Sequence, residues 1–225
     1  MTSADHADIA GHVTPGEGVW TLTMPGAVVR KLSVSDMDNN VYLVTCTATS
    51  DTLLVDAADD AARILTELER VGGGLGQVVT THRHWDHHRA LREVVQRTGA
   101  HTLAGEADAD ELSVPTGTRL THGDTVQVGR LSLGVISLRG HTRGSVALRL
   151  DVPDHPVVLL TGDSLFPGGP GKTGGAEDFT SLMDDLEDRV FGVDDDTTLV
   201  LPGHGDNTTL GAERPHLSQW RERGW

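Results

Sequence analysis

The sequence has a single cysteine, few basic residues and no long apolar run. The lone Cys46 excludes both a disulfide framework and a metal site built from cysteines. Lys and Arg total 18 against 33 for Asp and Glu, which gives a formal net charge of −15. Binding to a phosphate backbone requires clustered Lys or Arg. We therefore expect no nucleic-acid partner.

The start of the chain lacks the basic and then apolar segments of a secretory leader. No later apolar run approaches the ~20 residues that a membrane-spanning helix needs. We therefore expect a soluble, cytoplasmic protein with no membrane partner. At 225 residues the chain can bury a full core, and we interpret residues 1–225 as one domain.

Short β-rich runs alternate with amphipathic helical segments along the chain. The spacing of apolar residues predicts helices over 58–71, 86–97 and 179–190. Runs with strand character lie at 19–22, 40–47, 52–56, 77–80, 125–128, 131–138, 145–150, 157–160 and 198–201. Two successive β-then-α halves predict an α/β fold, a four-layer αββα sandwich.

Three histidines and an aspartate lie close together in the segment from His82 to His87. If a strand runs to about residue 84, alternation places His82 and His84 on the same side. If a helix begins at Asp86, this carboxylate and His87 share its first turn. Chance produces this spacing on the order of once in a few hundred such chains. Imidazole and carboxylate together are the ligands that zinc and similar divalent metals prefer.

Three further candidate ligands each follow an apolar strand. They are His141, Asp163 and His204, in the contexts Gly-His-Thr, Gly-Asp-Ser and Gly-His-Gly. A ligand presented from the edge of a sheet is held rigidly.

Together these motifs resemble the metallo-β-lactamase-fold hydrolase superfamily, over roughly residues 19–210. The resemblance implies the αββα sandwich and two divalent metal ions, with Zn²⁺ the expected metal and Fe or Mn as alternatives. It also implies a ligand set: His82, His84 and His141 on the first metal, Asp86, His87 and His204 on the second, and Asp163 on both.

Within the superfamily the chain is most similar to small glyoxalase II-like proteins, which cleave thioesters of hydroxy acids. The resemblance implies that a hydroxide shared by the metals attacks the carbonyl, with Asp86 orienting the hydroxide and carrying its proton. Two departures leave the substrate open. Only 21 residues follow His204, so we expect the extra helical domain of the glutathione-type enzymes, and with it the usual thiol-carrier site, to be absent. Two local motifs also differ. Arg143 stands where proline is common, and the family's Gly-Arg-Thr-Asp-Phe stretch is broken into Gly171-Lys172-Thr173 and Asp178-Phe179.

Three other activities remain open at this point. A lactonase or another ester hydrolase would use the same metals on a different acyl group. A persulfide dioxygenase of the same fold would use a single iron. A metal-binding protein without catalytic activity is the third.

Several neighbours of the ligands are candidates for supporting roles. We expect Lys172, one of two lysines, to hold an anionic group of a small-molecule substrate from a mobile glycine-rich segment, 168–175. A merely solvent-exposed lysine is the alternative. Trp85 and Arg143 are further candidates for substrate binding. Asp56 is expected to orient the histidine loop by hydrogen bonds, or else to be a simple turn residue.

Overall fold

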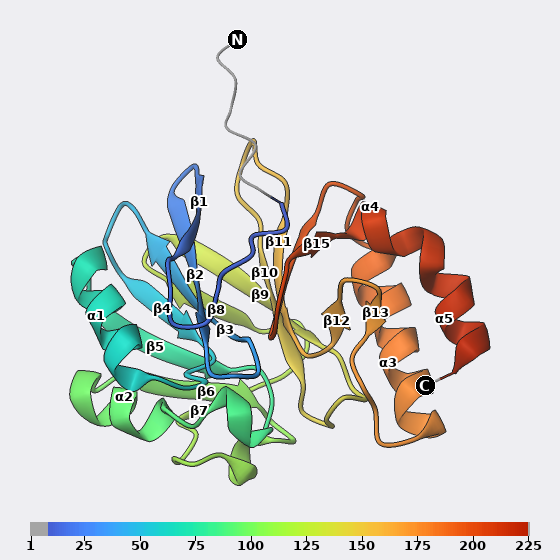
Figure 1. The fold of residues 1–225 in the computed structure, drawn as a ribbon, viewed down its shortest axis with the longest axis horizontal. Helices are drawn as coiled ribbons and strands as arrows, with labels where there is room; N and C mark the ends of the chain where they lie inside the picture. The colour runs from blue at the N-terminus through green and yellow to red at the C-terminus, as the bar shows by residue number, and fades with distance from the viewer. Residues whose placement is uncertain (1–8, 225) are drawn as a thin grey trace.

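The computed structural model describes residues 9–224, which form two β-sheets stacked between two layers of helices (Figure 1). The predicted αββα sandwich is therefore confirmed. The first residues of the chain, on which the expectation about a leader depends, lie outside the described part. Within residues 9–224, no helix is both long enough and apolar enough to cross a membrane.

The first sheet contains seven strands that are neighbours in chain order. They are β1 (Trp20–Met24), β2 (Ala27–Val34), β3 (Asn39–Cys46), β4 (Thr52–Val55), β5 (Leu75–Thr80), β6 (His101–Gly105) and β7 (Thr118–Leu120). The last four, β4 to β7, run parallel to one another. The loops that follow β4, β5 and β6 therefore leave the same edge of the sheet.

The second sheet has the strand order β15-β14-β11-β10-β9-β8. Its strands are β8 (Thr125–Val128), β9 (Leu131–Ser137), β10 (Val146–Leu150), β11 (Val158–Gly162), β14 (Leu199–Pro202) and β15 (Thr208–Thr209), and β12 (Leu165–Phe166) and β13 (Gly169–Pro170) form a separate hairpin. Strands β11 and β14 are parallel neighbours. Their ends therefore bring Asp163 and His204 close together.

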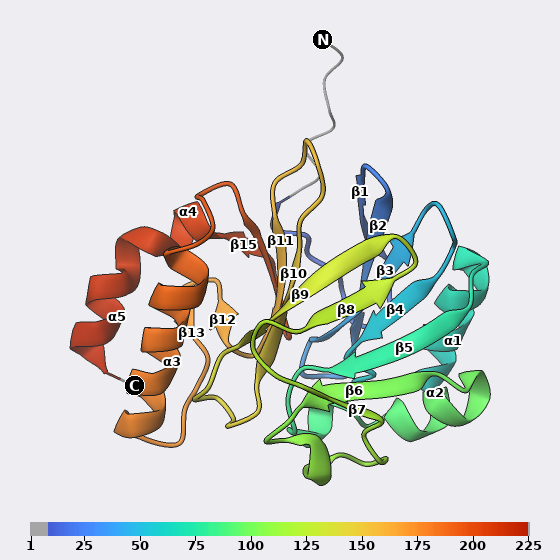
Figure 2. The same ribbon diagram turned by 180° about the vertical axis from the view of Figure 1, so that it is seen from behind.

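Helices α1 (Ala61–Val71) and α2 (Leu91–Thr98) cover the outer face of the first sheet (Figure 2). The outer face of the second sheet is covered by α3 (Ala176–Leu186), α4 (Leu210–Glu213) and α5 (Leu217–Arg223). Helix α1 begins where the side chain of Asp60 accepts a hydrogen bond from the amide of Arg63. It ends at Gly72, whose φ of 73° suits a glycine cap, as the sequence predicts.

Strand β3 shows how the layers are built, because its two faces pack against different neighbours. Tyr42 and Val44 lie in the apolar core between the sheets, whereas Val41 and Leu43 pack in the cluster beneath α1 and α2. Side chains alternate across a strand, so a strand buried on both faces reads as a continuous apolar run.

Two predicted boundaries near the histidine cluster are wrong. Strand β5 ends at Thr80 instead of reaching residue 84, and α2 begins at Leu91 instead of Asp86. Residues 85–87 form a separate 3₁₀ turn, η1 (Trp85–His87). The amides of Arg89 and Ala90 then bond to the carbonyls of Ala58 and Ala57, so they are unavailable to a helix started at Asp86.

Several elements were not predicted from the sequence. Strand β2 contains the polar pair Arg30 and Lys31 at its centre, which obscures its strand pattern. Strands β6, β7, β12, β13 and β15 have five residues or fewer. Helix α3 begins three residues earlier than expected and continues into a π-helical turn, η3 (Glu187–Phe191), which extends the predicted segment.

Candidate metal centre

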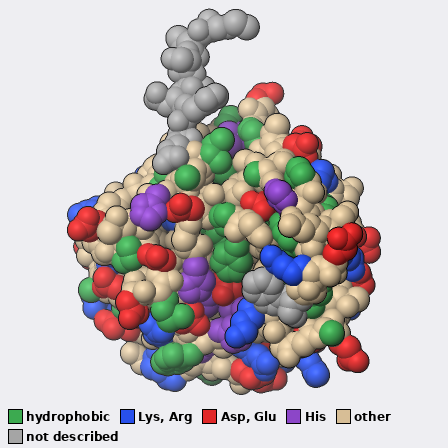
Figure 3. All heavy atoms as spheres, turned by 45° about the vertical axis from the view of Figure 1, so that its right-hand side comes forward, with side chains coloured by type: hydrophobic (Ala, Val, Ile, Leu, Met, Phe, Trp, Pro, Cys, Tyr) green, Lys and Arg blue, Asp and Glu red, His purple; other side chains and the backbone are tan. Residues whose placement is uncertain are grey.

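The structure brings all the proposed metal ligands together at one edge of the two sheets. Their ligand atoms form three overlapping groups, and within each group the atoms lie within 4.8 Å of one another. The groups are His82, His84 and His141; His82, His87 and Asp163; and Asp86, His87 and His204. Figure 3 shows histidine side chains near the middle of one face, beside Lys or Arg side chains and an apolar patch.

In the group of His82, His84 and His141, called the first group from here on, three imidazole nitrogens converge. Nε2 of His82 lies 3.1 Å from Nδ1 of His84 and 3.3 Å from Nε2 of His141. Nitrogen ligands arranged tetrahedrally around zinc lie about 3.3 Å apart. Nδ1 of His141 donates to the carbonyl of Lys172 at 2.6 Å, so Nε2 of His141 carries a lone pair. Lone pairs that face each other at this distance are stabilised by a proton or a metal ion between them.

The group of Asp86, His87 and His204, called the second group from here on, also has ligand atoms that converge. Nε2 of His87 and Nε2 of His204 lie 3.1 Å apart, and Oδ2 of Asp86 lies 3.5 Å and 3.3 Å from them. Nδ1 of His204 donates to the carbonyl of Met37 at 2.8 Å. Nδ1 of His87 lies 3.0 Å from a carboxylate oxygen of Asp56. The nitrogens that face Asp86 are therefore the ones free to bind a metal.

The carboxylate of Asp163 lies between the two groups. Its Oδ2 is 3.5 Å from Nε2 of both His141 and His204. Its Oδ1 is 3.4 Å from Nε2 of His87, and within residues 9–224 this buried oxygen has no hydrogen-bond donor. A buried carboxylate oxygen left without a partner is costly. The donor set and this unpartnered oxygen together fit divalent metal ions.

The pKa shifts in the site indicate that its carboxylates stabilise positive charge on two of its histidines. Burial opposes protonation of His87, but its interactions with Asp163 and Asp56 raise its pKa to about 10. Burial likewise opposes protonation of His204, yet Asp163 and Asp86 raise its pKa to about 9. The pKa of His82, by contrast, is held well below its usual value, first by burial and then by neighbouring histidines. A metal ion would replace the protons on the raised pair.

Asp56 lies behind the ligands and is linked by hydrogen bonds to a histidine of each group. One carboxylate oxygen accepts from the amide of Thr81 at 2.7 Å, and the other accepts from the Thr81 hydroxyl at 2.8 Å. That hydroxyl lies 3.1 Å from Nδ1 of His82, and Asp56 also contacts Nδ1 of His87. A single buried carboxylate thus orients one histidine of each group. Asp56 itself has a φ of 57°, a conformation that Asp tolerates better than most residues.

The loop that carries His204 is fixed by polar side chains that were not among the residues predicted from the sequence. Nζ of Lys31 donates to the carbonyl of Gly205 at 2.6 Å and to Oδ1 of Asn207 at 2.9 Å. Asn39 donates from Nδ2 to Oδ2 of Asp86 at 3.0 Å. The signal available in the sequence was the polar pair Asn39-Asn40 at the start of an apolar strand.

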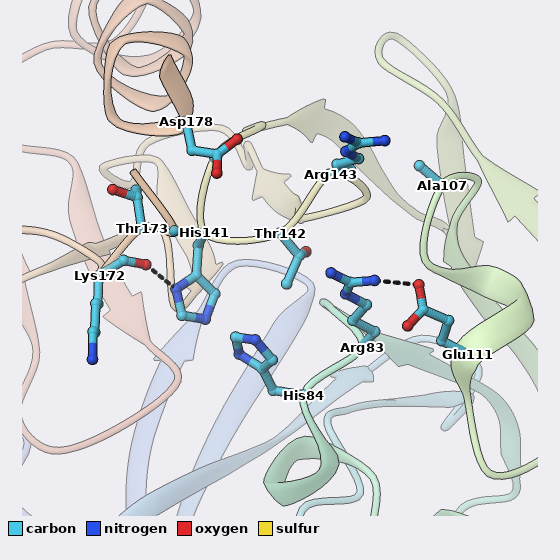
Figure 4. A pocket seen from close by; sticks show the side chains of 12 residues that line it. Arg83, His84, Ala107, Glu111, His141, Thr142, Arg143, Lys172, Thr173 and Asp178 are labelled. Carbon is cyan, nitrogen blue, oxygen red and sulfur yellow. Dashed lines mark hydrogen bonds and ion pairs between the residues drawn. The ribbon is translucent and has the colours of Figure 1, made fainter. Parts of the chain in front are cut away.

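A cavity of about 710 Å³ opens beside the first group (Figure 4). Its lining includes His84, His141, Arg143, Lys172 and Asp178. Arg83 also lines it, paired with Glu111. Two of the expected substrate-binding residues, Arg143 and Lys172, are therefore placed beside the centre.

The structure differs from two expectations about this surface. Trp85 is not among the residues that line the cavity; it is 59% exposed and stands edge-on to His88 at 5.1 Å. The segment around Lys172 is also more anchored than a free lid would be. The carbonyl of Lys172 accepts a hydrogen bond from His141. A Cβ at Gly171 would lie 1.7 Å from the carbonyl oxygen of Asp163, so the backbone of this segment packs against the centre.

Known proteins of similar sequence and structure share this fold. The sequence profile of the metallo-beta-lactamase superfamily matches residues 34–204. The chain belongs to this superfamily.

Among individual relatives, a hydroxyacylglutathione hydrolase from Ruegeria pomeroyi is 35% identical over 218 residues, covering 89% of this chain and 80% of that protein. The chain spans about half the length of other hydroxyacylglutathione hydrolases that it matches: the one from Fuscovulum blasticum is 38% identical over 135 residues, which are 60% of this chain and 51% of that protein.

Two solved structures are also similar. ETHE1 from Myxococcus xanthus has a TM-score of 0.74 and 30% identity, covering 84% of this chain and 82% of that one. TTHA1623 in a di-iron-bound form has a TM-score of 0.68 and 26% identity, covering 82% of this chain and 96% of that one.

Proposed function

We propose that the chain is a hydrolase that uses two divalent metal ions, Zn²⁺ being the expected metal, to cleave a thioester. The observation that carries the proposal is the pair of converging ligand groups on either side of the single carboxylate of Asp163. Similarity to hydroxyacylglutathione hydrolases supports thioester chemistry. Similarity to a protein described in a di-iron-bound form supports two metals.

The proposed ligands divide between the two ions. His82, His84 and His141 would hold the first, Asp86, His87 and His204 the second, and Asp163 both. When bound, the ions would lower the pKa of a water molecule and polarise the substrate carbonyl.

Asp86 is placed to orient the attacking water. Its interactions with His204 and Asn39 lower the pKa of its carboxyl despite partial burial, so it is ionised at neutral pH and can only accept a hydrogen bond. The only proton that it could pass to a leaving group is therefore the one it accepts from the attacking water. A thiolate, the anion of a thiol with a pKa of about 8.5, leaves with little protonation, whereas an alkoxide does not. This difference favours a thioester over an ordinary ester.

The cavity beside the first group supplies the proposed substrate site. Arg143 and Lys172 are exposed cations on its wall, in a chain of net charge −15. Cations in a cleft beside the reacting centre favour a substrate with an anionic group. We propose that this group lies on the part of the thioester remote from the carbonyl.

The test combines metal analysis with a substrate panel on the purified protein. We expect close to two metal ions per chain, hydrolysis of hydroxyacyl thioesters, loss of activity on chelation and recovery on adding Zn²⁺. His84→Ala, which removes one ligand from the wall of the cavity, is the variant expected to lose this activity. Faster hydrolysis of lactones would replace the thioesterase assignment with a lactonase. One iron per chain with oxygen consumption would overturn it in favour of a persulfide dioxygenase, and bound metal without turnover of any substrate would leave a binding protein.

A further inference from the structure

Asp108 is a fully buried carboxylate in the loop after β6, beside the metal centre. Because β4, β5 and β6 are parallel neighbours, the loops after them leave the sheet side by side. Asp56 follows β4, the ligand loop follows β5 and Asp108 follows β6. The ligand loop therefore runs between two buried aspartates, and only Asp56 was anticipated from the sequence.

The carboxylate of Asp108 joins two ligand loops. Its Oδ2 accepts from the amide of Arg83 at 3.0 Å and from the hydroxyl of Thr142. Its Oδ1 accepts from the amide of Gly144 at 2.9 Å. Arg83 lies between His82 and His84, and Thr142 follows His141. The segments that carry all three ligands of the first group are thus bonded to one side chain.

The backbone packs closely around Asp108. A Cβ at Gly144 would lie 2.4 Å from the amide nitrogen of Asp108 and 2.6 Å from its Cγ. A Cβ at Gly105 would lie 1.9 Å from the carbonyl oxygen of Gly144. Burying a carboxylate is costly unless donors satisfy it, and here three donors point at it.

We propose that Asp108 is a positioning residue that sets the affinity of the first metal by fixing the distance between the His82–His84 loop and His141. The proposal rests on the proposed metal centre. Partners that orient metal ligands typically change metal affinity by about 10-fold to 100-fold when they are removed. Asp56 differs from Asp108, because its contacts reach a histidine of each group.

The informative substitution is Asp108→Asn, which keeps size and removes the charge. All three of its hydrogen-bond partners are donors, so the amide NH₂ of Asn must face one of them, and the ion pair with Nε of Arg83, 4.0 Å from Oδ1, is lost. Asp110→Asn is the matched control, because Asp110 lies in the same loop but is exposed and pairs with Arg119 at the surface. Thr142→Val removes one of the three donors and leaves the carboxylate in place.

The Kd of each metal site is measured in a variant that lacks one ligand of the other site. In His204→Ala, we expect Asp108→Asn to weaken the Kd for Zn²⁺ at the retained first group at least tenfold, and Thr142→Val to weaken it less. In His84→Ala, we expect Asp108→Asn to leave the Kd of the second group within about twofold, and Asp110→Asn to have no effect in either background. Kd values come from competition with a chromophoric chelator.

The outcomes separate this inference from the proposed function. Equal weakening of both groups by Asp108→Asn, or no weakening of the first, overturns the positioning role. If Asp108→Asn does not fold, Thr142→Val decides, and an unchanged first-group Kd in that variant overturns the inference. Failure of the unsubstituted chain to bind two Zn²⁺ overturns the proposed function instead.

Discussion

Oδ2 of Asp56 lies 3.0 Å from Nδ1 of His87, and both side chains are buried. The same carboxylate reaches His82 through the hydroxyl of Thr81. We expect Asp56→Asn to reduce the affinity of both metals by about 10-fold to 100-fold, because one histidine of each group loses its orientation. Asn tolerates the backbone conformation at this position, so the variant tests the hydrogen bonds. Metal content after dialysis against a weak chelator measures the effect, and selective loss of a single ion would contradict it.

Asp163 should matter to both metals and His204 to one. We expect Asp163→Ala to lose both ions and all activity, because its Oδ2 faces both groups and its Oδ1 faces the second. His204→Ala should empty mainly the second site. Atomic absorption on protein purified without chelator gives the stoichiometry. Equal and full metal retention in the two variants would show that the ligand assignment is wrong.

Position 203 requires a glycine, because its backbone lies against two of the candidate ligands. A Cβ at this position would lie 2.2 Å from Oδ1 of Asp163 and 2.7 Å from Cε1 of His87. We expect Gly203→Ala to lower metal content and activity at least tenfold, because the displaced atoms are ligands or their neighbours. Gly74→Ala is the control, since a Cβ there meets nothing within 4 Å. Normal metal binding by Gly203→Ala would mean that the backbone shifts more easily than this packing indicates.

Lys172 should contribute to substrate binding and not to metal binding. His141 is held by the backbone carbonyl of Lys172, which every substitution retains. We expect Lys172→Ala to keep its metal and to lower kcat/KM for acidic thioesters by roughly tenfold, about 1.4 kcal/mol. Neutral analogues should be much less affected. Arg143→Ala is the parallel variant on the same cavity, and equal losses for acidic and neutral substrates would remove either residue from the site.

Lys31 should make stability depend on pH. Burial, opposed by Asp206 and Asp38, lowers the pKa of this fully buried ammonium to about 8. Between pH 8 and about 10.5 the unfolded state binds more protons than the folded state, so this group makes the free energy of unfolding rise with pH. The rise should reach at most about 3 kcal/mol. Urea denaturation of the unsubstituted chain and Lys31→Met across this range measures it as the difference in slope, and parallel curves would contradict it.

The clustering of the candidate ligands could be predicted because most of them are local in sequence. His82, His84, Asp86 and His87 carry their spacing on a single loop, whatever the exact end of β5. The start of α2 could not be predicted, because the bonds from Arg89 and Ala90 to residues 57 and 58 depend on tertiary contact. Asp108 is invisible in the sequence for the same reason: its partner Thr142 is 34 residues away. The polarity of Lys31 similarly hid a strand, since its partners Gly205 and Asn207 lie near the other end of the chain.

His141 and His204 are both held through main-chain carbonyls, those of Lys172 and Met37. The side chains of these two holding residues are exposed. Evolution can therefore replace either side chain without disturbing the metal ligand that its backbone supports. At positions 37 and 172 the placement of the histidine therefore depends on the backbone and not on the side chain, and at position 172, on the cavity wall, the side chain can change without moving His141.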